Sequence, residues 1–234
     1  MNWAVHRLTK TYGRFTALSE VTFSVRPGEV LGLIGPNGAG KTTLLECMAG
    51  VLPHEAGSVA VDGVALSPRE RAPRVFYLPD GIAPWPSETV NWALDFTLGF
   101  YGARDRDKAD VVERLGLAPL LHAPIGTLSK GQRKRAVLGI GLLTPQPLLL
   151  ADEPFDGLDL RQTREVSAAL RAYAAAGRTL FLSIHQISDA ARVCDRFVLL
   201  SGGRVCAEGT IAELAHRVNA PQTPNLEELF LALT

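Results

Sequence analysis

The stretch GPNGAGKTT, residues 35–43, decides how this sequence folds. It fits the pattern G-x-x-x-x-G-K-[ST], follows the apolar run EVLGLIG and opens the helix-like segment KTTLLECMAGV. This context predicts a loop between a strand and a helix, whose backbone N–H groups surround phosphate oxygens at the N-terminus of the helix. Lys41 would supply a cation to the β- and γ-phosphates of a nucleotide, and Thr42 a hydroxyl to Mg²⁺.

A second chemical feature is the acidic pair that ends the apolar run LLLADE. We expect Asp152 to hold Mg²⁺, directly or through water. The adjacent Glu153 could accept a proton from the attacking water or orient it. An acidic pair at a strand end is also found at helix caps and surface turns, so the pair alone leaves both interpretations open. The Gly-rich loop favours the catalytic one.

The segments around these two features predict an α/β fold. A strand over residues 3–9 and a strand–turn–strand in EVTFSVRPGEVLGLIG come first, and GSVAVDGVAL is typical of a hairpin that turns at Asp62-Gly63. Later, RTLFLSIH precedes the helical QISDAARVC, and RFVLLSGGRVCAEG precedes TIAELAHRV. This alternation favours a mainly parallel sheet, which the early hairpin region and a helical insertion, roughly 80–143, interrupt.

Composition limits the classes of function. Acidic and basic residues balance at 24 each, whereas proteins that mainly grip nucleic acid are usually basic. The run AVLGIGLLTPQPLLLA, residues 136–151, is free of charge, but it is short and contains two prolines. We therefore expect no segment that crosses a membrane by itself.

Five segments occur in an order that resembles the ATP-binding-cassette (ABC) ATPases: YGRFTALSEVTFSV, GPNGAGKTT, LSKGQRKR, LLLADEPFDGLD and LSIHQ. The resemblance covers about residues 3–233. It implies a single nucleotide-binding domain over 1–234, which is a P-loop NTPase of ABC type. In this family a RecA-like core carries an antiparallel β-subdomain and an inserted α-helical subdomain, here about 80–143, with a C-terminal helical end at about 210–234.

The resemblance also implies roles for single residues on the chain's own nucleotide. Tyr12 would stack on adenine, although a tyrosine there could also be a half-exposed strand-end residue. Glu153, His185 and Lys41 would be catalytic, with His185 at the γ-phosphate, although a lone histidine at a strand end is usually structural. The loop that holds the phosphates would comprise Gly35, Pro36, Asn37, Gly38, Ala39, Gly40, Lys41, Thr42 and Thr43.

In ABC ATPases the signature loop binds the ATP that the other subunit holds, so two ATPs are sandwiched between two head-to-tail subunits. Ser129 and Gly131, with Gln132, would therefore contact the partner's nucleotide. Asp159 would lie in the loop that faces the partner ATPase. A monomer would lack half of each site.

Two positions depart from the family pattern. Lys130 replaces the first signature glycine, which is tolerable if the position needs no positive φ. Asp80 stands after FYLP, where the family usually has Gln, or in many exporters Glu. With Thr42 and Asp152, Asp80 is a candidate metal ligand, but a carboxylate cannot donate a hydrogen bond as an amide can.

The function that this resemblance implies is an ATPase subunit, with ATP and Mg²⁺ as cofactors, that dimerises on ATP to drive a membrane transporter. The segments YLPD, AEGTIAEL and TPNLEELFLALT are similar to those of export systems with a separate integral membrane permease. The chain would sit at the cytoplasmic face of the membrane, as a homodimer or a heterodimer, and Trp85 is a candidate contact with the permease. No nucleic acid partner is expected. The alternative is a nucleotide-gated regulatory module whose basic stretch LSKGQRKR grips an anionic partner.

Overall fold

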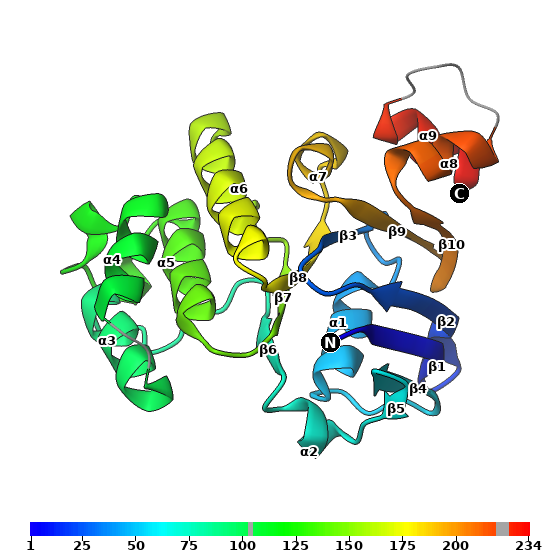
Figure 1. Cartoon of the computed structure of the whole chain (residues 1–234), viewed down its shortest axis with the longest axis horizontal. Helices are drawn as coiled ribbons and strands as arrows, with labels where there is room; N and C mark the ends of the chain where they lie inside the picture. The colour runs from blue at the N-terminus through cyan, green and yellow to red at the C-terminus, as the bar shows by residue number, and fades with distance from the viewer. Residues whose placement is uncertain (103–104, 219–224) are drawn as a thin grey trace.

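The computed structural model describes residues 1–102, 105–218 and 225–234. Two β-sheets and the helices that surround them make up the part of the chain so described (Figure 1). The six-stranded sheet lies in the middle of the view, the antiparallel sheet at lower right, and α3, α4 and α5 at the left. This arrangement confirms the α/β class with an antiparallel subdomain and an inserted helical subdomain.

The central sheet has the strand order β10-β9-β3-β8-β7-β6. Its strands β3 (Val30–Ile34), β7 (Leu148–Asp152) and β8 (Thr179–Ile184) are buried at every residue, as expected for apolar parallel strands covered on both faces. β6 (Val75–Leu78) pairs in parallel with β7, and β9 (Arg196–Ser201) pairs in parallel with β3. The prediction of a mainly parallel sheet is thus confirmed.

One strand of the central sheet differs from the prediction. The segment RFVLLSGGRVCAEG, read from the sequence as one strand before a helix, forms β9 and a second strand, β10 (Arg204–Gly209), which is antiparallel to it. Gly202 and Gly203 have φ of 52° and 74° and make the turn between them. Positive φ angles favour glycine, so the Gly202-Gly203 pair was a signal in the sequence for this turn.

The antiparallel sheet has the order β2-β1-β4-β5. It comprises β1 (Trp3–Tyr12), β2 (Phe15–Val25), β4 (Ala56–Val61) and β5 (Val64–Ala65). The predicted hairpin turn at Asp62-Gly63 is confirmed, with φ of 48° and 83°. One apolar cluster joins this sheet, one side of the central sheet and helix α1 (Lys41–Ala49), which ends at Gly50 as predicted.

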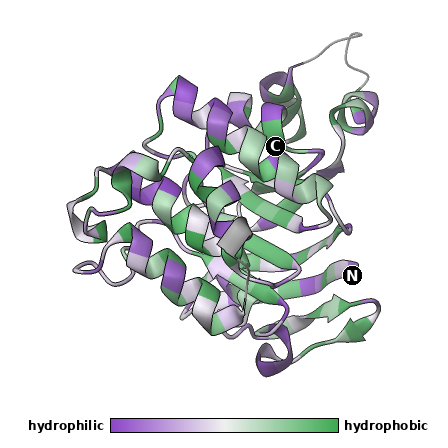
Figure 2. Cartoon of the chain, turned by 60° about the vertical axis from the view of Figure 1, so that its left-hand side comes forward, coloured by the Kyte–Doolittle hydropathy of each residue, from purple (hydrophilic) through white to green (hydrophobic). Residues whose placement is uncertain are grey.

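A second apolar cluster fills the other side of the central sheet. It includes the inserted helices α3 (Val90–Tyr101), α4 (Asp105–Arg114) and α5 (Lys130–Leu143). The insertion is not helical throughout, because residues 115–129 contain only the short 3₁₀ turns Ala118–Leu120 and Ile125–Thr127. In Figure 2 the strands show mainly green, apolar residues, and most helices carry purple, polar residues as well.

The remaining helices flank the core. They are the short α2 (Pro68–Arg71), then α6 (Leu160–Ala175), α7 (Ile187–Val193), α8 (Ile211–Arg217) and α9 (Leu226–Leu233). Residues 219–224 of the expected helical end lie outside the described residues. None of the helices described here combines the length and the apolar character that crossing a bilayer requires.

Candidate functional site

The carboxyl ends of the parallel strands bring the predicted residues to one edge of the central sheet. The Gly-rich loop follows β3, Asp152 ends β7, and His185 follows β8. Asp80 follows the edge strand β6 after one residue. Because ligands in open parallel sheets bind outside the carboxyl ends of the strands, this edge is the candidate site.

The Gly-rich loop depends on its glycines for two different reasons. Gly38 and Gly40 have φ of 81° and 102°, and Gly40 is the N-terminal cap of α1. At Gly35 the need is space, because a β-carbon there would lie 2.3 Å from the carbonyl oxygen of Leu200. No side chain caps the first turn of α1, so its N–H groups face the loop and make a ready site for an anion.

Lys41 is buried at the centre of this loop. Its Nζ donates to the carbonyl oxygens of Gly35 and Pro36 at 2.8 and 3.3 Å. Burial lowers the pKa of the ammonium, while the negative charges of Glu153 and Asp152 act to raise it. A cation held in this way among backbone dipoles is suited to phosphate.

A cavity of about 340 Å³ opens beside the loop. Tyr12, which is 48% exposed, lies at its wall together with Phe15, whose ring is also exposed. The sequence reasoning did not single out Phe15. Two exposed aromatic rings beside a phosphate loop are suited to an apolar, stackable group such as a nucleobase. The other lining residues are Ala17, Asn37, Gly38, Gly40, Lys41, Thr42, Thr43 and Glu153.

Two of the three candidate metal ligands, Thr42 and Asp152, lie in contact with each other. Thr42 Oγ1 donates to Asp152 Oδ2 at 2.7 Å, and the hydroxyl of Ser183 donates to Asp152 Oδ1. Asp152 is buried at the end of β7. A hydroxyl beside a carboxylate is an oxygen donor set that suits Mg²⁺, so the chemistry of these two residues fits that ion.

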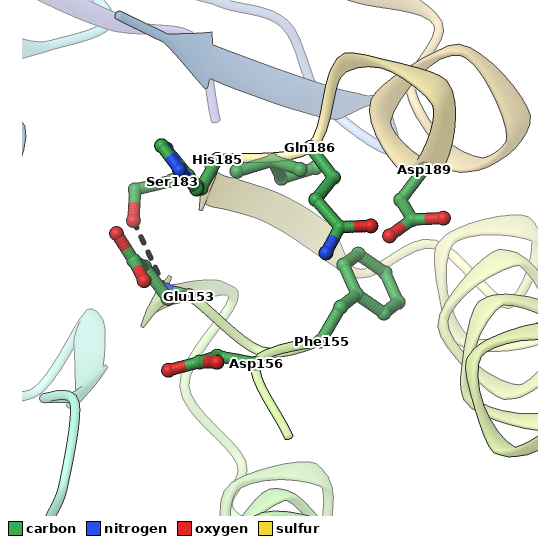
Figure 3. Close-up of a pocket in the computed structure, with 8 residues that line it drawn as sticks. Glu153, Phe155, Asp156, Ser183, His185, Gln186 and Asp189 are labelled. Carbon is green, nitrogen blue, oxygen red and sulfur yellow. Dashed lines mark hydrogen bonds between the residues drawn. The ribbon is translucent and has the colours of Figure 1, made fainter. Parts of the chain in front are cut away.

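Glu153 adopts an unusual backbone conformation next to this pair. Its φ is 48°, in a region that non-glycine residues seldom occupy and that costs free energy. Its N–H donates to both the carbonyl oxygen and the hydroxyl of Ser183, at 3.2 and 3.0 Å (Figure 3). Ser183 therefore contacts both the carboxylate of Asp152 and the backbone N–H of Glu153.

Glu153 and His185 line the same small cavity with Ser183, and Figure 3 shows these residues at the ends of the two strands. His185 is exposed. The structure thus brings a carboxylate and an imidazole together at the edge where the phosphate loop begins.

The signature residues lie at the start of α5 and do not line the cavity around Lys41. Ser129 caps α5: its hydroxyl accepts from the N–H of Gln132 at 3.3 Å, and Gln132 Oε1 accepts from the N–H of Ser129 at 3.0 Å. Gly131 is required by space, because a β-carbon there would lie 2.5 Å from the carbonyl oxygen of Gly157. Asp159 caps α6 by accepting from the N–H of Gln162 at 2.8 Å.

Lys130 does not have a positive φ, so this position tolerates the replacement of glycine. Its ammonium pairs with Asp156, in the loop that follows Glu153. Two other basic residues of the stretch, Lys134 and Arg135, are also engaged within the chain. Lys134 pairs with Asp80 at 2.5 Å, and Arg135 donates to the carbonyl oxygen of Leu115 at 3.0 Å.

Asp80 therefore has a counter-ion from α5. Burial acts to raise the pKa of the Asp80 carboxyl, but the hydrogen bond and the charge of Lys134 outweigh burial and hold that pKa below its usual value. Carboxylate oxygens of Asp80, Glu153 and Asp156 lie within 4.8 Å of one another. The structure places Asp80 in this group rather than with Thr42 and Asp152.

Sequence reasoning missed four members of the site: Phe15, Asp156, Ser183 and the pairing of Lys134. Ser183 precedes His185 by two residues and is a polar residue on an otherwise apolar strand. That polar side chain was a signal in the sequence that Ser183 could belong to the site. The ion pairs had no such signal, because each joins residues at least 26 positions apart.

Comparison with known proteins gives one consistent result. The model of the family described as ABC transporter matches residues 18–156. The linearmycin resistance ATP-binding protein LnrL of Bacillus subtilis is 30% identical over 218 residues, which are 90% of this chain and 70% of that protein. The Nod factor export ATP-binding protein I of Rhizobium etli is 34% identical over 208 residues, which are 86% of this chain and 66% of that protein.

A solved structure described as the ATP binding subunit of an ABC transporter superposes with a TM-score of 0.88 at 28% identity. The superposition covers 100% of this chain and 99% of that chain. The family model spans more than half of the sequence and includes both the Gly-rich loop and the acidic pair. This chain therefore belongs to the ABC transporter family, as one of its nucleotide-binding, ATP-hydrolysing subunits.

Proposed function

We propose that this ATPase subunit, as a dimer that closes on ATP and Mg²⁺, drives export through an integral membrane subunit at the cytoplasmic face of the membrane. One observation carries the proposal. Lys41, the Thr42–Asp152 pair, Glu153 and His185 meet at one edge of the sheet, while Ser129 and Gly131 lie outside the cavity that contains Lys41. The chain thus has two separate half-sites, each suited to phosphate.

In the first half-site, Lys41 and the N–H groups of the loop and of α1 bind the β- and γ-phosphates. Thr42 and Asp152 would hold Mg²⁺, which would supply positive charge to the phosphoryl group. Glu153 accepts the proton of the attacking water or orients it, and His185 donates to the γ-phosphate. Tyr12 and Phe15 stack against the base. Catalysis is then positioning and charge stabilisation, as in other phosphoryl transfers.

In the second half-site, Ser129 donates from its hydroxyl and Gly131 from its N–H to a phosphate bound by the other subunit. A hydroxyl can accept one hydrogen bond and donate another, so the capping bond from Gln132 leaves the Ser129 proton free to donate. Asp159 lies at the start of α6, on the loop after Glu153, where the two subunits would face each other. We propose a homodimer, because this single chain carries the residues of both half-sites.

The surface that would receive the membrane subunit is an exposed aromatic ladder, formed by Trp85, Trp92, Phe96 and Phe100. Adjacent ring centroids lie 5.1 to 6.2 Å apart, and Phe100 is 71% exposed. An apolar cluster of this kind is typical of an interface. Three of its four rings lie on α3, which packs against α5 in the inserted helical subdomain. Export is supported by the name of one relative, the Nod factor export ATP-binding protein I of Rhizobium etli.

The test combines a trap with a pull-down. The variant Glu153→Gln keeps the shape of the side chain but removes the base, so we expect it to accumulate an ATP-bound dimer, measured by sedimentation with ATP and Mg²⁺. The full chain, purified from its native membranes under mild detergent, should bring an integral membrane protein with it. Unchanged steady-state turnover of Glu153→Gln would refute the assignment of Glu153. A complex with RNA or DNA at physiological salt, and no membrane protein, would refute the transport function.

A further inference from the structure

We propose that Lys134 is a positioning residue for Glu153, and that Asp80 is its anchor rather than a metal ligand. The inference rests on the proposed function, because it concerns how the hydrolytic carboxylate is held. It assigns a purpose to the two charges, Asp80 and Lys134, that lie next to the phosphate edge and that the mechanism above leaves unused.

The first observation is the place of the Lys134 ammonium. Lys134 lies on the second turn of α5, and its Nζ contacts two groups of the core at once. One is Asp80 Oδ1 at 2.5 Å, and the other is the backbone carbonyl oxygen of Asp152 at 3.3 Å. The Lys134 side chain is 13% exposed and that of Asp80 is 43% exposed, so water screens this contact less than it screens a pair in which both side chains are exposed.

The second observation is that the carbonyl of Asp152 and the N–H of Glu153 belong to one peptide unit. That unit is planar, so fixing both of its polar ends fixes the orientation of the whole plane. Lys134 donates to the carbonyl end, and Ser183 accepts from the N–H end. The peptide that leads into Glu153 is therefore held between α5 and β8.

The third observation shows what these two hydrogen bonds, together called the peptide clamp, would stabilise. Glu153 has a φ of 48°, and a non-glycine residue stays in that region only when its surroundings over-determine it. Rotation of the 152–153 peptide would relax the strain and swing the carboxylate away from the water it has to activate. Lys134 and Ser183 oppose that rotation. Because Ser129 begins the same helix as Lys134, the peptide clamp also links the half-site offered to the partner with the base of this chain's own site.

The fourth observation is why Asp80 is needed. An ammonium that is mostly buried requires a partner, and the Asp80 carboxylate supplies it directly. The neighbouring pair Lys130–Asp156 is a natural comparison, since it uses the same helix but is more exposed, at 55% and 39%, and Lys130 has no contact with the 152–153 peptide among the hydrogen bonds of the described residues. Lys134 therefore differs from Lys130 in its contact with the 152–153 peptide and not in its charge.

The experiment compares Lys134→Met, Lys134→Arg, Asp80→Asn and the double variant in the full chain. Arg114→Met is the matched control, because Arg114 pairs with Asp110 on the surface of α4, away from the site. We expect Lys134→Met to lower kcat by about tenfold or more while the equilibrium affinity for ATP stays within about twofold. Lys134→Arg should recover part of kcat, and the double variant should be no worse than Lys134→Met, since the two residues act as a unit.

A second measurement does not depend on turnover. Amide hydrogen exchange in the segment 152–156 should become faster in Lys134→Met than in Arg114→Met, with the melting temperature of each variant recorded as a check on folding. Equal kcat and equal exchange in Lys134→Met and Arg114→Met would overturn the proposal. So would a loss of ATP affinity in proportion to kcat, or a strong rise in the Mg²⁺ requirement of Asp80→Asn alone, which would make Asp80 a metal ligand. Absence of turnover in the unmodified chain would instead count against the proposed function, and hydrogen exchange would still decide the role of Lys134.

Discussion

The N-termini of α1 and α5 are both proposed to meet phosphate, but they are built in opposite ways. α1 begins at Gly40 with no side-chain cap, and its loop turns toward a buried Lys41. α5 begins at Ser129, and Ser129 and Gln132 satisfy each other's backbone N–H groups. An uncapped helix start leaves its first N–H groups to a ligand or to water, whereas the capping box of α5 already engages the N–H groups of Ser129 and Gln132. We therefore propose an order of binding, in which α1 holds nucleotide in a monomer and α5 adds its contact when a partner arrives.

The largest effect on ATP turnover is expected from a substitution in the loop that precedes and begins α1. Lys41→Ala removes the buried cation that the loop encloses, so we expect ATP turnover to fall by at least about 100-fold and ATP affinity to fall with it. Equilibrium nucleotide binding and steady-state turnover measure the two losses. Arg114→Ala, at a surface pair with Asp110, serves as the control. Retention of normal ATP affinity by Lys41→Ala would mean that the loop binds phosphate without its cation.

A smaller and more selective effect is expected at α5. Ser129→Ala should leave the ATP affinity of the monomer within about twofold, but lower turnover by about tenfold and weaken the ATP-bound dimer that Glu153→Gln accumulates. The loss of the cap would also destabilise the chain by about 1 kcal/mol. Sedimentation and thermal unfolding follow the two consequences separately.

Ser129→Asp distinguishes the cap from the phosphate contact. Aspartate caps a helix as well as serine does, but it cannot donate a hydrogen bond when ionised. Stability should therefore be retained while turnover is lost. Full turnover in Ser129→Asp would show that the hydroxyl only caps α5.

The smallest effect is expected at Lys130, beside the cap. Its ammonium is paired with Asp156 in an exposed position, so Lys130→Gly should change turnover by no more than about threefold. A decrease of more than about tenfold, measured under the same conditions, would instead place this ammonium on the partner's phosphate. That result would mean that a lysine binds phosphate at both helix starts, Lys41 at α1 and Lys130 at α5.

The contrast between the two helix starts also explains what the sequence could predict. The loop of α1 is local: its glycines, lysine and threonine lie within nine consecutive residues, and the apolar strand before them has one clear pattern. The hairpin at Asp62-Gly63 is local in the same sense. The acidic pair was likewise placed correctly at the end of β7, because an apolar run followed by two acids shows where a buried strand stops.

The contacts that the sequence could not predict join residues that are far apart along the chain. The role of the signature loop came from a family resemblance, not from its own residue pattern. The pairing of Lys134 with Asp80 spans 54 positions, and the contact between Ser183 and Asp152 spans 31. Neither follows from periodicity, since both require the order of strands in the sheet and the packing of α5 against it. The unusual φ of Glu153 is a product of that packing as well.

The aromatic ladder has an optical consequence. The chain has three tryptophans: Trp3 is buried in the antiparallel subdomain, while Trp85 and Trp92 are each 39% exposed. Trp92 stacks on Phe96, and Trp85 meets the same ring edge-on. A quencher dissolved in water would reach Trp85 and Trp92 and leave Trp3 emitting as an internal reference. Burial of the ladder under a membrane subunit would protect those two fluorophores, so the assembly of the transporter can be followed by intrinsic emission without any label.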